Sequence, residues 1–196
     1  MRSTSPFLVY SLALLMVWTA SGCNRATEAT APDAAAMPPF VTDYTIKDLM
    51  LNVIDTNADV VWLSVTTVAS DKGLVETRPT TDEEWARVHA GAITLAEAAN
   101  LLMIPRRTAR PGEKSIVPGV ELEPEEMDVN IAKDRENFNK HARALYDAAR
   151  LAAQAAEKKD ADKIFEIGET IELACENCHK TYWYPNEKIP ELPPSQ

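Results

Sequence analysis

The sequence predicts an all-α fold, an antiparallel four-helix bundle, and two observations carry that prediction. Apolar residues recur every three to four positions along four stretches, a spacing that places them on one side of a helix. Prolines and other turn residues separate these stretches, and no apolar alternation long enough for a sheet is found in the 196 residues. Two short connections and one long one suit helices that run alternately up and down.

The N-terminus, residues 1–22, is expected to be a signal peptide rather than part of the fold. Arg2 supplies the positive region, and residues 7–20 are almost entirely apolar. That stretch is short for a bilayer span of about 20 residues but suits a signal-peptide core. The small residues Ala-Ser-Gly then precede Cys23, which resembles a bacterial lipoprotein cleavage site with Cys23 as the acylated residue. The alternative is ordinary secretory cleavage, with Cys23 left as a free thiol.

Residues 23–39 are rich in Ala, Thr and Pro, have almost no large apolar side chain, and indicate a flexible tether. Residues 40–196 are long enough for one domain with its own core. The first helix is expected over residues 43–69, with Thr42 or Asp43 as its cap. Its apolar stripe consists of Ile46, Met50, Val53, Val61, Val65 and Val68.

Three further helices follow. The second begins at Thr81, with Glu84 in the capping-box position, and stops at Pro105. Residues 105–123 hold three prolines and two glycines and predict a long irregular loop. The third helix is expected over 124–158, since proline is favoured in a first turn, and the fourth over 161–184.

A Cys-x-x-Cys-His motif occupies residues 175–179 on the last predicted helix. Residues i and i+3 share a helix face, so Cys175 and Cys178 can each form a thioether to one haem. His179 is then placed to bind the iron from the proximal side, and the motif indicates covalent haem c attachment.

Other uses of the motif are less well supported. A redox Cys-x-x-Cys normally follows a strand at a helix start, and no strand pattern precedes this one. A structural zinc site needs four ligands, usually from a second cysteine pair, which the chain lacks. A disulfide across three residues remains open, but it leaves His179 without a role. Export also supports haem, because c-type haem is attached outside the bacterial inner membrane.

The motif near the end of the last helix of an exported four-helix bundle resembles the class II c-type cytochromes, which include cytochrome c′ and its low-spin relatives. This resemblance covers about residues 40–190. It implies that Cys175, Cys178 and His179 hold one haem c, and that the first helix faces the other side of the iron. In the low-spin relatives that residue is a methionine, and in cytochrome c′ it is apolar.

Met50 is the candidate for the sixth iron ligand. Counting from the predicted helix ends at about 1.5 Å per residue places it nearly level with His179, and it lies on the apolar stripe. Core packing is the ordinary role of such a methionine. His141 is a weaker competitor, Met103 and His89 are weaker still, and a vacant sixth position is the remaining alternative.

The function predicted from these observations is that of a monohaem cytochrome carrying single electrons between periplasmic or membrane-bound partners. It is not an enzyme, because no nucleophile–base pair or phosphate loop is found, and it is anchored to a bacterial membrane through Cys23. Two alternatives remain open: a five-coordinate protein that binds nitric oxide or another small gas, and an accessory subunit of a respiratory complex. A homodimer is also compatible with the sequence.

The charge of the chain restricts its partners. A net charge of −10 makes nucleic acid a poor partner and favours a basic redox protein. A basic group, Lys47, Arg106, Arg107 and Arg110, is either solvated or paired with haem propionates. Tyr182 and Trp183 are the aromatic residues best placed to pack on a macrocycle, whereas core packing is expected of Trp62 and Trp85.

Overall fold

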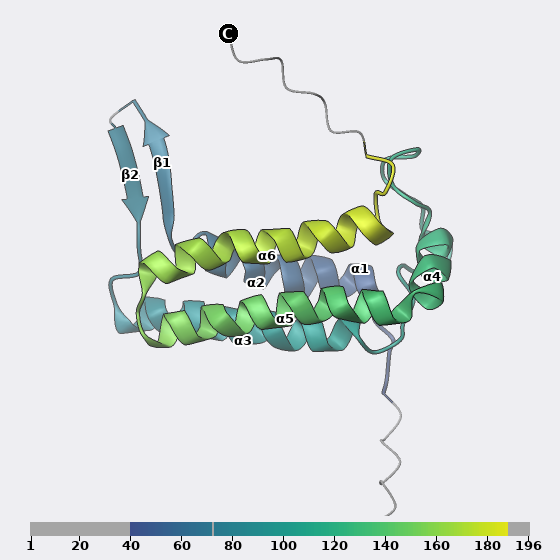
Figure 1. Cartoon of the computed structure of the whole chain (residues 1–196), viewed down its shortest axis with the longest axis horizontal. Helices are drawn as coiled ribbons and strands as arrows, with labels where there is room; N and C mark the ends of the chain where they lie inside the picture. Colours follow the sequence, from purple (N-terminus) through teal and green to yellow (C-terminus); the bar gives the residue numbers. More distant parts are fainter. Residues whose placement is uncertain (1–39, 72, 188–196) are drawn as a thin grey trace, which may run out of the picture. The chain divides into compact units, whose positions relative to one another are not determined.

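The described residues of the computed structural model, 40–71 and 73–187, are mostly helical and include one small two-stranded sheet (Figure 1). The predicted signal peptide, tether and Cys23 lie outside the described residues. The elements are α1 (Ile46–Leu49), η1 (Met50–Ile54), α2 (Asp55–Trp62), β1 (Thr66–Ser70), β2 (Gly73–Thr77), α3 (Asp82–Leu102), α4 (Pro124–Lys133), α5 (Arg135–Glu157) and α6 (Ala161–Tyr182). The prediction of a purely α-helical fold is therefore wrong in one respect, the sheet.

The first helical run begins later and ends earlier than its apolar spacing suggests. Thr45 is the cap: its side chain accepts a hydrogen bond from the Asp48 N–H, and the Asp48 carboxylate accepts one from the Thr45 N–H. This reciprocal capping box fixes the start of α1 at Ile46, and its cap lies two residues after Asp43. The run ends at Trp62, so the helix predicted to continue to Ala69 is too long.

A π-helical turn, η1, interrupts this run at Met50. The Asp55 N–H donates to the Met50 carbonyl, five residues back rather than four. The buried residues explain the turn, since Leu49 and Ile54 both lie in the core although they are five positions apart. Inserting one residue at this point brings the apolar side chains before and after it onto the same side. The apolar stripe after the turn is Ile54, Ala58 and Val61.

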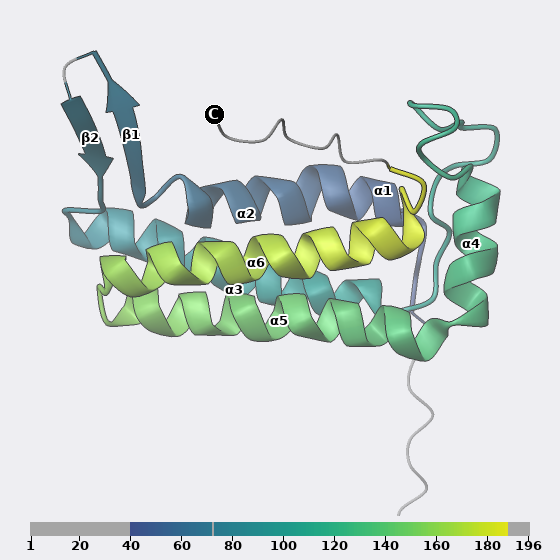
Figure 2. The same cartoon turned by 45° about the horizontal axis from the view of Figure 1, so that its top comes forward.

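Strands β1 and β2 form a hairpin that extends away from the helices (Figure 2). Val68 pairs with Val75 and Ala69 with Leu74, while Ser70 and Gly73 close the turn. Gly73 has φ = 105°, a conformation that glycine adopts without strain. Nearly every residue of both strands is exposed, so the hairpin adds little to the core. Val68, expected on a buried helix stripe, is an exposed strand residue instead.

The second and fourth predicted helices are confirmed, and the third is interrupted. Thr81 and Glu84 form the expected capping box of α3. The helix predicted over 124–158 breaks at Asp134, whose backbone (φ −125°, ψ 45°) is not helical. The Tyr182 hydroxyl donates to the Asp134 carbonyl at 3.2 Å, and α4 lies across the ends of the longer helices (Figure 2). The last helix ends at Tyr182, two residues before the predicted end.

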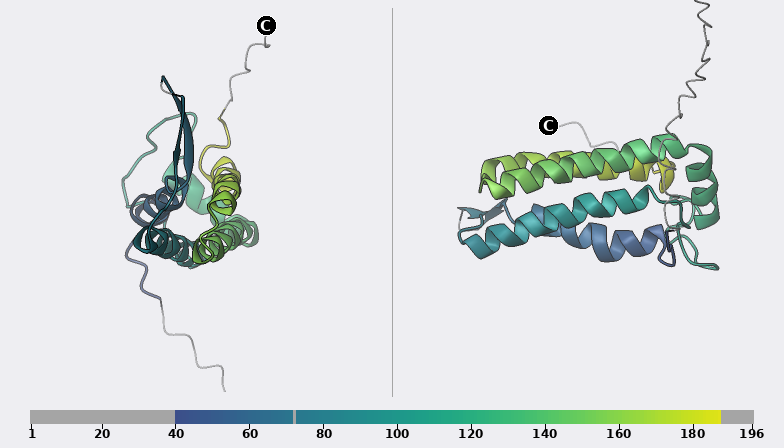
Figure 3. Two further views of the ribbon diagram at one scale, coloured as in Figure 1. Left: turned by 90° about the vertical axis from the view of Figure 1, so that its left-hand side faces the viewer. Right: turned by 90° about the horizontal axis from the view of Figure 1, so that it is seen from below.

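The core lies between the α1–α2 run, α3, α5 and α6, which Figure 3 shows end-on. Small side chains let α3 and α5 approach closely, and both helices bury several alanines there: Ala92, Ala96, Ala98 and Ala99 from α3, and Ala148, Ala149, Ala152, Ala155 and Ala156 from α5. Helix α5 also packs extensively on α6, and α3 on α2. The contact between α2 and α6 is the sparsest of these four.

Gly91 permits the close approach of α2 to α3. A Cβ at this position would lie 2.6 Å from Val60 Cγ1 and 3.0 Å from Val60 Cβ. We expect Gly91→Ala to lower the free energy of unfolding by about 1–3 kcal/mol, the usual cost of overpacking, despite the better helix propensity of alanine. Chemical denaturation would measure it.

The Val60→Ala background supplies the control for this prediction. It removes the nearer of the two clashing atoms, so Gly91→Ala should cost much less there than in the wild-type chain. An equal cost in both backgrounds would contradict the packing explanation.

Candidate functional site

The two thiols lie on one face of α6, close to its end. Cys175 and Cys178 are both free and half-buried, and both pack against the core. Ile171 and Tyr182, fully buried on the same helix, continue this face to either side. The spacing of three therefore places both sulfur atoms at the margin of the core, as the motif predicts.

Burial also sets the protonation state of the thiols. It raises the pKa of Cys175 to about 11, with smaller contributions from nearby acids, and the pKa of Cys178 to about 12. Redox-active cysteine pairs have a lowered thiol pKa instead, because the thiolate is the reactive form. No group of three or more His, Cys, Asp or Glu residues able to hold a metal ion occurs among the described residues. Neither a redox dithiol nor a zinc site is favoured here.

His179 follows the second thiol and is half-buried. Its ring lies edge-on to Trp183, with 5.0 Å between centroids, and is tilted against Tyr184 at 5.8 Å. The Tyr184 hydroxyl donates to the Glu176 carboxylate at 2.5 Å, which holds that ring in place. Burial lowers the pKa of His179, opposed by the Glu176 charge. The imidazole is thus neutral at neutral pH, the form whose lone pair can bind a metal.

The register between α2 and α6 can be read from one hydrogen bond. Trp62 Nε1 donates to the Gly168 carbonyl at 3.0 Å. Seven residues before Trp62 is Asp55 and seven after Gly168 is Cys175, and the Asp55 charge acts on the Cys175 thiol. The two helices are antiparallel in Figures 1 and 2, with α1 beside the end of α6.

The same register extends to Met50, the predicted sixth ligand. Met50 is half-buried, packs on the core and opens the π-helical turn. It precedes Asp55 by five residues, and His179 follows Cys175 by four. At about 1.5 Å per residue the two positions lie within about one helical turn of each other along the bundle. π-Helical turns occur frequently at functional sites.

Of the competing ligand candidates, His89 is placed least favourably. His141, on α5, contacts the Tyr182 ring edge-on with 6.0 Å between centroids, and Asn137 Nδ2 lies 3.5 Å from its Nε2. His89 lies in the first half of α3, whose start is tied to the α5–α6 turn by the Lys159–Asp82 ion pair. The start of α3 therefore lies beside the beginning of α6, whereas His179 lies near the end of α6. Met103 packs on the core at the other end of α3.

The loop 105–123 forms hydrogen bonds both to α1, the helix before Met50, and to the residue after the end of α6, the helix that carries His179. The sequence did not predict these contacts. The Ile46 and Lys47 N–H groups donate to the Arg107 and Thr108 carbonyls, both at 2.9 Å. At the other end of the loop, the Leu122 N–H donates to the Trp183 carbonyl at 2.8 Å.

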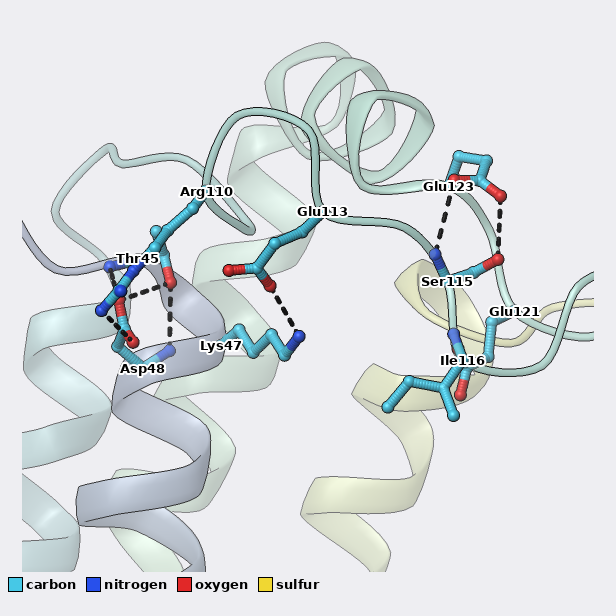
Figure 4. A network of polar contacts seen from close by, with 9 residues as sticks. All are labelled: Thr45, Lys47, Asp48, Arg110, Glu113, Ser115, Ile116, Glu121 and Glu123. Atoms are coloured by element: carbon cyan, nitrogen blue, oxygen red, sulfur yellow. Dashed lines mark hydrogen bonds and ion pairs between the residues drawn. The ribbon is translucent and has the colours of Figure 1, made fainter.

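Side chains fix the loop further (Figure 4). Lys47 pairs with Glu113 at 2.6 Å and Arg110 with Asp48 at 3.1 Å. The Ser115 hydroxyl donates to Glu123 at 2.8 Å. Prolines and glycines predict a loop here, but its partners are set by tertiary contacts.

The residues predicted to surround a haem are the basic residues and the aromatic residues, and the structure gives them different partners. Lys47 and Arg110 already have carboxylate partners. Within the described part of the chain, Arg106 donates to the Ile104 and Tyr44 carbonyls, both at 3.4 Å, and to no carboxylate. Trp183 contacts His179, whereas Tyr182 turns into the core and contacts Phe138 at 5.3 Å between centroids. Trp85 is a core residue, also as expected, and Trp62 is half-buried against Gly168.

No protein-family model, curated protein or solved structure matches the chain. Within residues 40–71 and 73–187, no helix has the length and apolar character needed to cross a bilayer.

Proposed function

We propose that this protein is a monohaem c-type cytochrome that transfers single electrons outside the cytoplasm. One observation carries the proposal: a half-buried face of α6 presents two free thiols and, next to them, a half-buried imidazole.

The chain's own residues are suited to the attachment. Each Sγ–H adds across a vinyl double bond, sulfur to one carbon and hydrogen to the other, so no oxidant is consumed. Cys175 and Cys178 are reduced and protonated, as this addition requires. A bound haem supplies reversible one-electron chemistry at its iron. His179 donates its lone pair to that iron, and the Trp183 and Tyr184 rings restrict the rotation of its imidazole.

Met50 is proposed as the second axial ligand. The α2–α6 register places it about level with His179, and the loop 105–123 joins the two helix ends that carry them. Two persistent ligands lessen rearrangement on electron transfer, and a thioether ligand raises the reduction potential.

The helix arrangement is proposed to be an antiparallel four-helix bundle of the class II cytochrome kind, formed by the α1–α2 run, α3, α5 and α6. The hairpin and the crossing helix α4 are additions to that pattern. Export by the predicted signal peptide and acylation of Cys23 complete the proposal of a lipid-anchored, periplasmic protein.

The test is expression of the full precursor in a bacterium that attaches c-type haem. We expect one haem per chain that stays bound after denaturation, detected by peroxidase staining of a denaturing gel and by mass. Exported, soluble protein without covalent haem in that host would refute the proposal.

A further inference from the structure

An exposed apolar segment marks the beginning of the described chain. Phe40 is 57% exposed, Val41 82% and Tyr44 68%. Large apolar and aromatic side chains in one short segment are unusual on a surface that meets only water. Tyrosine and phenylalanine in such a position are typical of residues that enter the interface of a bilayer.

A basic cavity of about 460 Å³ adjoins this segment. Thr42, Asp43 and Thr45 form one wall, and Arg106, Arg107 and Arg110 the other. Arg106 reaches the apolar segment directly, since its Nη1 donates to the Tyr44 carbonyl. We name Phe40, Val41, Tyr44, Arg106, Arg107 and Arg110 together the aromatic–basic surface.

Two of these arginines have no carboxylate partner among residues 40–71 and 73–187. Arg106 donates only to backbone carbonyls, and Arg107 forms no side-chain ion pair within the described part of the chain. A third guanidinium, Arg135, donates to the Leu102 carbonyl and is close enough to Arg106 to repel it. Arg110 pairs with Asp48, and Asp43 is the one acid in the cavity wall. The cavity therefore carries net positive charge.

Some acids lie close by: Asp48 pairs with Arg110, Glu113 pairs with Lys47, and the Asp128 carboxylate accepts hydrogen bonds from Thr108. The positive charge of this surface therefore rests on Arg106 and Arg107, and much of the overall charge of −10 is carried elsewhere. Several of the acids lie far away: Asp82, Glu83 and Glu84 begin α3, whose 21 residues separate them from the arginines that follow its end. That separation is about 30 Å along the helix, whereas the screening length at physiological salt is about 8 Å.

We propose that the aromatic–basic surface docks on an anionic phospholipid bilayer, with headgroup phosphates at Arg106 and Arg107 and Phe40, Val41 and Tyr44 in the interface. In the sequence, only residues 24–39 separate Phe40 from Cys23, the residue predicted to carry lipid. The inference rests on the proposed lipid anchor only for bringing a membrane within reach. It adds that the domain lies against the membrane by one defined face.

The test uses residues 23–196 with Cys23→Ser, which removes the acyl anchor, exported behind an ordinary cleavable signal peptide in a bacterium that attaches c-type haem. Sedimentation is measured with vesicles of about one third phosphatidylglycerol in phosphatidylcholine, and with pure phosphatidylcholine. We expect binding to the anionic vesicles alone.

Each basic residue contributes about 1 kcal/mol at an anionic surface, about fivefold in affinity. Arg106→Gln/Arg107→Gln should therefore weaken binding about 25-fold, and Phe40→Ser/Val41→Ser should weaken it as well.

Matched controls use Arg87→Gln/Arg143→Gln, two exposed arginines of α3 and α5 that form no ion pair in the described chain. This double variant should bind the anionic vesicles with the same affinity as the Cys23→Ser protein. Equal weakening in both arginine pairs, or no binding to anionic vesicles, would overturn the inference. Inhibition by inorganic phosphate at constant ionic strength would assign the cavity to a free oxyanion instead, and would also overturn it.

Arg107→Gln alone is the variant least able to disturb folding, because its exposed side chain forms no recorded contact. It should weaken binding about fivefold. Haem content is measured on the same samples, so the two proposals can fail separately. Vesicle binding without covalent haem would refute the proposed cytochrome function but support the docking surface. Covalent haem without vesicle binding would support the cytochrome function but refute the docking surface.

Discussion

Cys175→Ala/Cys178→Ala is expected to abolish covalent haem completely. Both thioethers are lost, and no other cysteine lies in the described part of the chain. Peroxidase staining after denaturing electrophoresis should fall from one haem per chain to none. The fold should persist, because both side chains are half-buried at the edge of the core. Thermal unfolding of the haem-free wild type and the variant should therefore agree to within about 2 kcal/mol.

The third cysteine supplies the matched control. Cys23→Ser should leave haem content unchanged while releasing the protein from the membrane fraction, because Cys23 is proposed to carry lipid and not haem. Haem retained by the double variant after denaturation would show attachment elsewhere and contradict the assignment of the motif. Haem lost from Cys23→Ser would contradict the division of roles between the cysteines.

Met50→Ala is expected to change the iron coordination of the haem-loaded protein without releasing the haem. Loss of a thioether ligand should turn a low-spin ferric spectrum into a high-spin one and lower the reduction potential. Axial ligands span about 0.8 V among haem proteins, so a fall on the order of 0.1 V or more is expected. Absorption spectroscopy and a redox titration measure both effects.

Met103→Ala is the control, since Met103 is another half-buried methionine packed on the same core. It should leave spin state and potential unchanged, although it loses similar packing. A wild-type ferric protein that is already high-spin, and stays so in Met50→Ala, would contradict the ligand assignment. That result would favour the gas-binding alternative, which a vacant sixth position characterises.

Local sequence rules predicted the helices well where a single side chain decides a boundary. Thr81 and Glu84 cap α3 as expected because the capping box needs only residues three positions apart. Pro105 stops the same helix, and Pro124 opens α4. The spacing of Cys175 and Cys178 likewise fixed their shared face without tertiary information.

The hairpin was missed although its sequence carries a turn pattern. Thr66–Ser70 and Gly73–Thr77 are rich in β-branched residues, and the sequence Asp-Lys-Gly at positions 71–73 is typical of a turn. Val65 and Val68 also fit the helix stripe of the preceding residues, and that longer pattern was preferred. Short apolar runs are ambiguous in this way because both periods can accommodate them.

The break at Asp134 could not be predicted from neighbouring residues. No glycine or proline lies near it, and its chain neighbours favour a helix. The break is instead accompanied by a hydrogen bond from the Tyr182 hydroxyl, which lies 48 residues away in the sequence. The attachment of loop 105–123 to α1 and α6 depends on partners equally remote in the chain.

The π-helical turn holds one residue more than an α-helical turn between Leu49 and Ile54, and it keeps the core side chains before and after it in phase. Deleting exposed Leu51 would leave these two residues four positions apart, an ordinary separation for one face of an α-helix. The core contacts on both sides and the loop partners of Lys47 and Asp48 would then be kept, and the change would be confined to the turn that Met50 opens. The extra residue therefore alters the local backbone beside Met50 without altering the register of the helix on either side.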